Sequence, residues 1–309
     1  MIKIDLITGF LGSGKTTFLK LYVKQLMKQG LKVGILENDF GAVNVDMLLL
    51  QDLLGEQCDL EMVSGGCDKD CHQRRFKTKL IAMGMRGFDR VIVEPSGIYD
   101  VDEFFDTLHE EPLDEWYEIG SVIAIVDAKL EETLSPASDY LLASQLADAG
   151  QVVLSKVQEA TPEQITHTME HLNRALEQIR CGRRLGEDVI KKDWKDFTQE
   201  DFDGIRDCGY RSEPYVKMDL DEEKQFQSLF FMEMHLTPEQ LRNAAERILR
   251  DAECGTVFRV KGFTQEENHW IEINATREQT EVKQLEKGQE IFIVIGEDLK
   301  EDVIRKQLQ

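Results

Sequence analysis

The 309-residue chain lacks two features, a long hydrophobic run and an excess of basic residues. A membrane-spanning helix needs about 18 consecutive apolar residues, and no stretch of the sequence is that long. The apolar run at residues 2–7 is too short for the hydrophobic region of a secretory signal. Lys and Arg number 37 against 59 Asp and Glu, which gives a net charge of −22. Because nucleic acid and anionic membranes bind to basic surfaces, we expect neither as a partner.

Cysteine is also sparse, with six residues in the whole chain. The cysteines are scattered apart from the close pair Cys67 and Cys71, and no His-rich or low-complexity tract occurs. We expect a cytoplasmic protein, in which such cysteines are reduced thiols or metal ligands more often than disulfides. Hydrophobic residues make up 41% of the chain, enough for a core, and the length suits two domains or one large one.

A glycine-rich segment, Gly-Phe-Leu-Gly-Ser-Gly-Lys-Thr-Thr, follows the first apolar run. It lies between a predicted strand at 2–7 and a predicted helix at 15–30, the context in which G-x-x-x-x-G-K-[ST] binds a nucleoside triphosphate. The glycines let backbone N–H groups approach phosphate oxygens, the lysine reaches the β- and γ-phosphates, and the first threonine binds Mg²⁺. A glycine-rich turn with an exposed lysine is the alternative. The predicted nucleotide-binding residues here are Gly9, Gly12, Ser13, Gly14, Lys15, Thr16 and Thr17.

Acidic residues follow two further predicted strands, and parallel strands bring such loops to one ligand. Asp39 and Asp46 follow the strand predicted at 31–36 and are candidates to bind Mg²⁺ or to position water; a plain loop carboxylate is the alternative for each. Glu94 begins the sequence Glu-Pro-Ser-Gly after an apolar strand, which is typical of the acidic residue that holds Mg²⁺. Gly97 would offer its N–H to the γ-phosphate, unless this segment is only a Pro-Ser-Gly turn.

The close cysteine pair lies between a predicted strand at 59–63 and a basic helix. Three residues separate Cys67 from Cys71, which falls within zinc-type spacing, and His72 is adjacent. Sulfur and imidazole suit Zn, Co, Ni or Fe rather than Mg. Structural zinc sites usually use two such pairs, and two small buried side chains are the alternative. The pattern predicts a transition-metal site with Cys67, Cys71 and His72 as candidate ligands.

The order of predicted elements indicates two domains. Strands alternate with helices over residues 1–182, which predicts an α/β fold, a P-loop NTPase with a doubly wound, mostly parallel sheet. Residues 183–211 are charged and weakly periodic, which predicts a helical or irregular connection. Residues 212–309 read as a second, smaller α+β domain, with antiparallel strands, helices on one face and no obvious catalytic constellation.

Four segments in this order resemble the CobW-type family of P-loop GTPases, a group that includes metallochaperones and cofactor-insertion GTPases. They are residues 9–17, the Asn-Asp-Phe-Gly segment at 38–41 through Asp46, Gly66-Cys67, and the Glu-Pro-Ser-Gly segment at 94–97. The resemblance continues through Asp127 and Ala147-Asp148. Residues 255–263 and 291–296 are similar to the family's accessory domain, so the resemblance covers most of the chain. The Glu-x-x-Gly segment is a specific mark of this group among GTPases.

The family's metal motif, Gly-Cys-x-Cys-Cys, is only partly present. Cys67 fits, but Lys69 and Asp70 stand where the other thiols would be, and Cys71 comes one residue later. A site rebuilt from Cys67, Cys71 and either His72 or Asp70, and the loss of the site, are both open.

The family's guanine motif, Asn-Lys-x-Asp, reads Ser155-Lys156-Val157-Gln158. An aspartate accepts two hydrogen bonds from the guanine edge, whereas Gln158 offers one acceptor and a donor amide. The predicted base-binding residues are Ser155, Lys156 and Gln158, and the base is guanine or adenine. Glu159 would replace the missing carboxylate if the register shifted.

The resemblance implies a Mg²⁺-dependent switch that binds and hydrolyses GTP. Asp39 and Glu94 would be catalytic, and Thr16 would join them around Mg²⁺. The implied output is delivery of Zn, Co or Ni, or activation of a client metalloenzyme or corrinoid protein; a homodimer is open. Two other functions are weighed, a nucleotide-binding adaptor with little hydrolysis and a P-loop small-molecule kinase, although no arginine-rich lid is evident.

Overall fold

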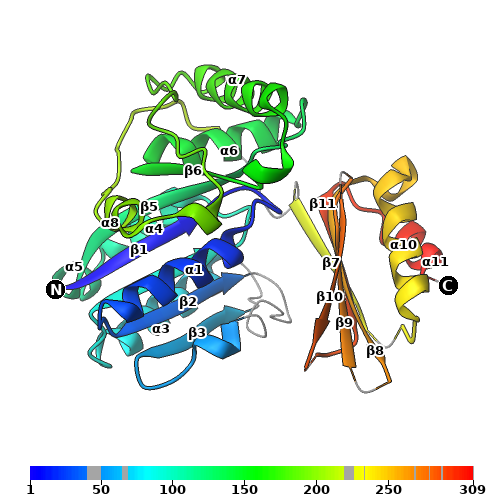
Figure 1. The fold of residues 1–309 in the computed structure, drawn as a ribbon, viewed down its shortest axis with the longest axis horizontal. Coiled ribbons are helices and arrows are strands. Elements are labelled where there is room, and N and C mark those ends of the chain that lie inside the picture. Colours follow the sequence, from blue (N-terminus) through cyan, green and yellow to red (C-terminus); the bar gives the residue numbers. More distant parts are fainter. Residues whose placement is uncertain are drawn as a thin grey trace. The chain divides into compact units, whose positions relative to one another are not determined.

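The structure, a computed structural model, divides into two compact units, Met1–Met218 and Asp219–Gln309 (Figure 1). It describes residues 1–39, 50–64, 69–218, 226–232, 234–267, 269–277, 279–286 and 288–308. Two predicted site residues, Asp46 and Cys67, therefore lie outside the described residues. Among the described residues, no helix is long and apolar enough to cross a membrane.

A six-stranded sheet in the order β3-β2-β4-β1-β5-β6 forms the centre of the first unit. All its pairings are parallel, so the predicted doubly wound α/β fold is confirmed. The sheet is apolar where both faces are covered, as buried parallel sheets are; all six residues of β4 are buried. The strands are β1 Ile2–Thr8, β2 Val33–Asp39, β3 Cys58–Ser64, β4 Arg90–Pro95, β5 Tyr117–Asp127 and β6 Gln151–Ser155.

Helices cover both faces of this sheet (Figure 1). On one face, α1 Lys15–Lys28 lies against β1, β2 and β4, and α8 Gln199–Arg206 lies against β5. The buried Phe18 and Tyr22 of α1 fill the space between this helix and the sheet. The other helices are α3 Lys69–Gly84, α4 Val101–Leu108, α5 Leu113–Trp116, α6 Pro136–Asp148 and α7 Pro162–Gln178, with short 3₁₀ turns η1 Gln51–Leu53, η2 Val157–Glu159 and η3 Trp194–Asp196.

Residues 183–211, expected to connect the two domains, instead pack on the first unit. Ile190 pairs in parallel with Val153 of β6, and Ile205 of α8 is fully buried in the core with α1. The first unit continues to Met218 and does not end at residue 182, and the second begins at Asp219 instead of near residue 212. The buried residues of this segment, Arg183, Leu185, Val189 and Ile205, are unevenly spaced among polar and charged ones, so the sequence shows no sustained helical or strand period.

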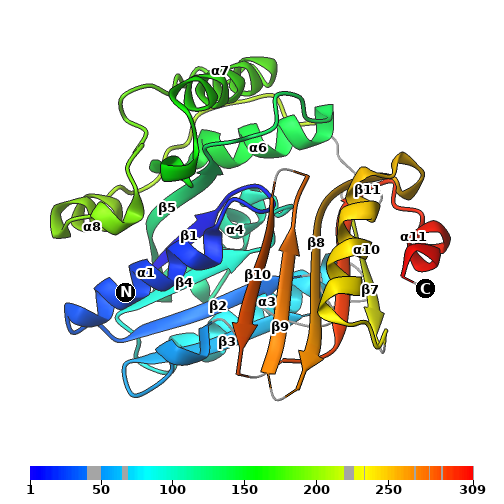
Figure 2. The ribbon, with the colours of Figure 1, turned by 45° about the vertical axis from the view of Figure 1, so that its right-hand side comes forward.

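The second unit is an antiparallel five-stranded sheet in the order β10-β9-β8-β11-β7 (Figure 2). Helices α10 Pro238–Arg250 and α11 Glu301–Gln307 pack on one face through a shared apolar core, with the 3₁₀ turn η4 Ala252–Cys254 after α10, so the predicted α+β fold is confirmed. The sequence analysis missed β10, a mostly exposed edge strand of sequence Thr-Glu-Val-Lys-Gln-Leu. The strands are β7 Phe226–Met232, β8 Thr256–Glu266, β9 His269–Ala275, β10 Thr280–Leu285 and β11 Ile291–Glu297.

Candidate functional site

The glycine-rich loop joins the end of β1 to the start of α1. Gly9, Gly12 and Gly14 all have positive φ angles, of 147°, 78° and 94°, a region that favours glycine. A Cβ on Gly9 would lie 2.1 Å from the carbonyl oxygen of Ile125 in β5, so a side chain has no room there. The backbone N–H of Ser13 donates to Phe10 O at 3.2 Å and closes the turn. The loop conformation therefore depends on glycine at these positions.

Two side chains at the start of α1 organise the centre of the site. The buried ammonium group of Lys15 donates to the carbonyl oxygen of Gly9 at 2.9 Å, which keeps the charge over the loop. The hydroxyl group of Thr16 donates to Oε1 of Glu94 at 2.7 Å. Glu94 is only 5% exposed, at the end of β4. The fold thus brings into contact two predicted Mg²⁺ ligands that are 78 residues apart.

Three buried hydroxyl groups near the loop have no hydrogen-bond partner in the described part of the chain. They belong to Thr8 at the end of β1, Ser13 in the loop and Ser96 after β4. Since buried polar groups are nearly always paired, three such groups around one loop make this edge a candidate site for a polar ligand. Gly97 lies against the same loop, because a Cβ there would be 2.7 Å from the backbone nitrogen of Leu11.

The sequence analysis missed Glu37, a second buried carboxylate beside Glu94. Glu37 is 3% exposed and pairs in register with Glu94 across β2 and β4. Side chains in register on parallel neighbours share a face, so both carboxylates lie on the face covered by α1. Asp39 is the last residue of β2. The available signal was a glutamate directly after the apolar run Val-Gly-Ile-Leu, two residues before the predicted Asp39.

The other face of β2 contacts the helix that carries the candidate metal ligands. His72 of α3 is 2% exposed, and its Nε2 lies 2.7 Å from Oδ1 of Asn38. An amide oxygen only accepts, so His72 donates through Nε2. Cys71 is half-buried on the same helix. Within the described residues, no three His, Cys, Asp or Glu side chains lie close enough to hold a metal ion.

The other described cysteines are free thiols suited to packing. Burial raises the pKa of the Cys58, Cys208 and Cys254 thiols to about 11 in each case. A thiol with a raised pKa is neither a ready nucleophile nor a ready metal ligand at neutral pH. Of the predicted transition-metal ligands, the structure describes Cys71 and His72.

Two family matches together cover nearly the whole chain. Residues 3–184 match the family described as CobW/HypB/UreG, nucleotide-binding domain. The chain belongs to the CobW family. Residues 221–309 match the cobalamin synthesis protein cobW C-terminal domain. The resemblance inferred from the loop, the Glu-Pro-Ser-Gly segment and the C-terminal strands is thereby confirmed.

Three curated relatives resemble this CobW-family chain over part of its length. Zinc chaperone YeiR of Escherichia coli (strain K12) is 32% identical over 164 residues, which are 53% of this chain and 49% of that protein. Zinc chaperone YjiA of the same strain is 29% identical over 174 residues, 54% and 52% of the two chains. Zinc-regulated GTPase metalloprotein activator 1 of Schizosaccharomyces pombe is 25% identical over 173 residues, 53% and 41%. The chain spans about half the length of the curated relatives it matches.

The altered CobW-family base motif follows β6. Ser155 is buried, and Lys156 has a positive φ of 53°. The ammonium group of Lys156 lies 2.6 Å from Oδ2 of Asp127, while Gln158 is exposed in η2. Glu159, the alternative carboxylate, pairs with Lys129 at 3.0 Å. The geometry therefore gives no support to a register shift that would put Glu159 in place of an aspartate.

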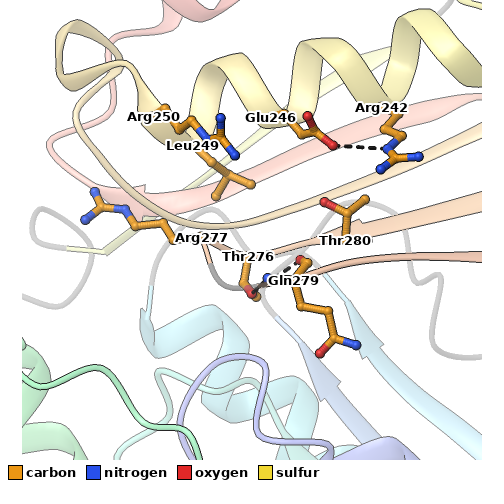
Figure 3. A pocket seen from close by; sticks show the side chains of 8 residues that line it. All are labelled: Arg242, Glu246, Leu249, Arg250, Thr276, Arg277, Gln279 and Thr280. Atoms are coloured by element: carbon orange, nitrogen blue, oxygen red, sulfur yellow. Dashed lines mark hydrogen bonds and ion pairs between the residues drawn. The ribbon is translucent and has the colours of Figure 1, made fainter. Parts of the chain in front are cut away.

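The second unit has a polar pocket of different chemistry, between α10 and the turn from β9 to β10 (Figure 3). Arg242, Arg250 and Arg277 line it, and Nε of Arg242 donates to Oε1 of Glu246 at 3.0 Å. None of the residues that the sequence predicts for nucleotide or metal binding lies in this pocket. The predicted chemistry is thus confined to the first unit.

Proposed function

We propose that this CobW-family chain is a Mg²⁺-dependent nucleoside triphosphatase, with GTP as its expected substrate. The observation that carries the proposal is the 2.7 Å hydrogen bond from Thr16 to Glu94 beside the Lys15 loop. A hydroxyl and a carboxylate are oxygen ligands of the kind Mg²⁺ prefers, and the ammonium group of Lys15 would contact the β- and γ-phosphates. The unpaired hydroxyl groups of Thr8, Ser13 and Ser96 support a polar ligand at this edge.

In this proposal the carboxylates have different roles in binding Mg²⁺ and positioning water. Glu94 holds Mg²⁺ directly or through water, and Asp39 or Glu94 orients the attacking water. Glu37, in register with Glu94, adds negative charge on the same face and favours a divalent cation there. Gly97 presents its backbone N–H to the γ-phosphate. Its carbonyl oxygen accepts from Nε2 of Gln145 at 3.2 Å, which supports the turn from the opposite side.

We further propose that the nucleotide state governs a transition-metal site, with zinc as the first candidate because the curated relatives are called zinc chaperones. Cys67, Cys71 and His72 would supply sulfur and imidazole ligands, with Co and Ni as competing metals. The contact between His72 and Asn38 ties this helix to β2, the strand that also carries Glu37. The metal would go to a client enzyme.

Hydrolysis and metal binding are tested separately. We expect Mg²⁺-dependent release of phosphate from GTP, and Glu94→Gln should abolish this release while nucleotide still binds. Turnover that needs no Mg²⁺, or that Glu94→Gln leaves intact, would contradict the assignment of Glu94. Binding without turnover favours an adaptor, and phosphate transfer to an added small molecule favours a kinase.

Metal binding is tested by titrating the protein with Zn²⁺, Co²⁺ and Ni²⁺, with and without a non-hydrolysable GTP analogue. Cys67→Ser combined with Cys71→Ser should weaken binding of at least one metal, because thiolates are strong ligands of these ions. The matched control is Cys58→Ser, a buried thiol outside the predicted set. Unchanged affinity for all three metals in the double variant would remove the chaperone site.

A further inference from the structure

Trp194 lies at the same edge of the parallel sheet as the glycine-rich loop. Ile190 forms an isolated parallel bridge to β6, since its N–H donates to Val152 O at 3.0 Å and its carbonyl accepts from Leu154 N at 2.9 Å. The chain therefore leaves Ile190 toward the carboxyl ends of the strands, where nucleotide ligands bind in sheets of this kind. Trp194 comes four residues later, at the start of η3.

The indole of Trp194 is held against the loop and the base motif. Its Nε1 donates to the carbonyl oxygen of Leu154 at 3.0 Å, and its ring meets Phe18 edge-on at 5.3 Å between centroids. A Cβ on Gly14 would lie 3.4 Å from Cη2 of Trp194 and 3.6 Å from Cβ of Ser155. The indole and the first residue of the base motif thus flank the same point of the loop. The ring remains partly exposed.

Two described carboxylates beside the base motif, Asp127 and Glu159, already have partners. Asp127 pairs with Lys156 at 2.6 Å and accepts from the backbone N–H of Lys129 at 2.8 Å. Glu159 pairs with Lys129 at 3.0 Å. The position that carries an aspartate in the guanine motif carries Gln158. Recognition of the two guanine donors by a carboxylate is therefore weak at this site, whereas an aromatic face stacks with any base.

We propose that Trp194 is the main base-binding residue and that it binds purines by stacking, so that the site accepts adenine nucleotides as well as guanine nucleotides. The inference rests on the proposed nucleotide function and goes beyond it, because it assigns the base contact to a residue outside the motif. A flat indole fixed through Nε1 and Phe18 loses little freedom on binding. Stacking contributes affinity without reading the base edge.

The first test makes Trp194 the sole tryptophan by Trp116→Phe and Trp270→Phe in the full chain. GDP, ADP and tripolyphosphate are titrated in the presence of Mg²⁺, with binding followed by calorimetry and by tryptophan emission. We expect GDP and ADP to change the emission and to bind within about tenfold of each other, because edge recognition is weak. Tripolyphosphate should bind without a comparable change, since it fills the phosphate loop but has no base.

The second test removes the ring. Trp194→Leu should weaken GDP and ADP binding about tenfold each, the size expected for one lost stacking contact, and Trp194→Phe should retain most of the affinity. Tripolyphosphate affinity is the internal control, because it reports an intact loop. The emission experiment keeps the native side chain, so the inference is still tested if Trp194→Leu fails to fold.

Three outcomes overturn the inference. GDP binding that leaves Trp194 emission unchanged would place the base elsewhere. Equal GDP affinity of Trp194→Leu and the parent protein would show that stacking contributes nothing. A preference for GDP over ADP of more than about a hundredfold would show edge recognition of the ordinary strength. If neither nucleotide nor tripolyphosphate binds, the proposed function fails as well, which separates the two failures.

Discussion

The buried polar groups toward the two ends of the parallel sheet differ in how completely they are paired. Toward the amino end, the fully buried carboxylate of Asp5 accepts from Arg90 at 2.7 and 2.8 Å, from the Tyr22 hydroxyl at 2.9 Å and from the N–H of Ser121 at 2.8 Å. At the carboxyl end of the same strand, the buried hydroxyl of Thr8 has no partner in the described part of the chain. One strand therefore carries both kinds of group.

The paired groups around Asp5 stabilise the fold, whereas the unpaired hydroxyl of Thr8 lies beside the proposed nucleotide site. A buried charge that is fully hydrogen-bonded holds its neighbours in place, and its loss is costly. The network also reaches the segment that carries Trp194, because Nη1 of Arg90 and the hydroxyl of Ser121 donate to the carbonyl of Arg206. Unpaired buried groups at the other end reduce stability, and the proposed nucleotide would satisfy them.

The largest effect on stability is expected from Asp5→Ala. Removing this carboxylate leaves the Arg90 guanidinium buried without its counter-ion and should lower the free energy of unfolding by about 4 kcal/mol. Urea unfolding measures the loss. Glu118→Ala is the control, because the Lys3–Glu118 pair is exposed on the same sheet, and it should leave stability unchanged within error. Equal losses in the two variants would show that burial adds nothing to the contribution of the Asp5–Arg90 pair.

Lys15→Ala should show the opposite behaviour at the carboxyl end. Loss of the ammonium group removes the main positive charge of the loop, so GDP affinity should fall by about 3 kcal/mol, roughly 150-fold. The free energy of unfolding should fall much less, by about 1 kcal/mol, because the hydrogen bond from Lys15 to Gly9 goes to a neutral carbonyl. Calorimetry with Lys20→Ala, on the same helix, is the control. A large loss of stability with intact GDP affinity would make Lys15 structural.

The sequence predicted the regular strands and the glycine-rich loop better than the irregular parts of the fold. The strands β4 and β5 contain the apolar runs Val91–Val93 and Val122–Val126, and the glycine loop is a complete motif, so composition and spacing were enough. Glu37 was missed because a polar residue at a strand end looks like the beginning of a loop. Trp194 was missed because its neighbours are charged and its contact with Gly14 depends on the fold.

Asp148, in α6, is a buried acid far along the chain from the glycine-rich loop. It shows how an incompletely paired buried carboxyl group lowers the stability of the fold. It is 6% exposed, and its Oδ2 has no hydrogen-bond partner among described residues. Burial, then the charges of Asp102 and Asp100, raise the pKa of Asp148 to about 7, against the opposing effects of Lys217 and Arg183. The folded chain holds this proton after the unfolded chain has lost it, so stability falls as pH rises from about 4 to 7.

Asp148→Asn should remove that fall, because asparagine stays neutral. At pH 8 the variant should be about 2 kcal/mol more stable than the parent, and near pH 4 the two should be alike. Urea unfolding across this pH range measures the difference. Asp139→Asn on the same helix, whose carboxylate is hydrogen-bonded to His171 at 2.6 Å, is the contrasting control and should gain nothing. A gain at pH 4 as large as that at pH 8 would show that charge is not the cause.

The smallest effect is expected at the base motif, where Gln158→Asp restores the aspartate of the guanine motif. The new carboxylate can accept two hydrogen bonds from the guanine edge, which should raise the preference for GDP over ADP by about tenfold, or about 1.4 kcal/mol. Gln158 is exposed in η2, so the free energy of unfolding should not change. Competition between GDP and ADP measures the ratio, and Gln164→Asp in the first turn of α7 controls for added charge. The GDP-to-ADP ratio could instead stay constant while Trp194→Leu still weakens binding of both nucleotides. The base motif would then play no part in the choice of base, and this site would recognise only the phosphates and the flat ring of the base.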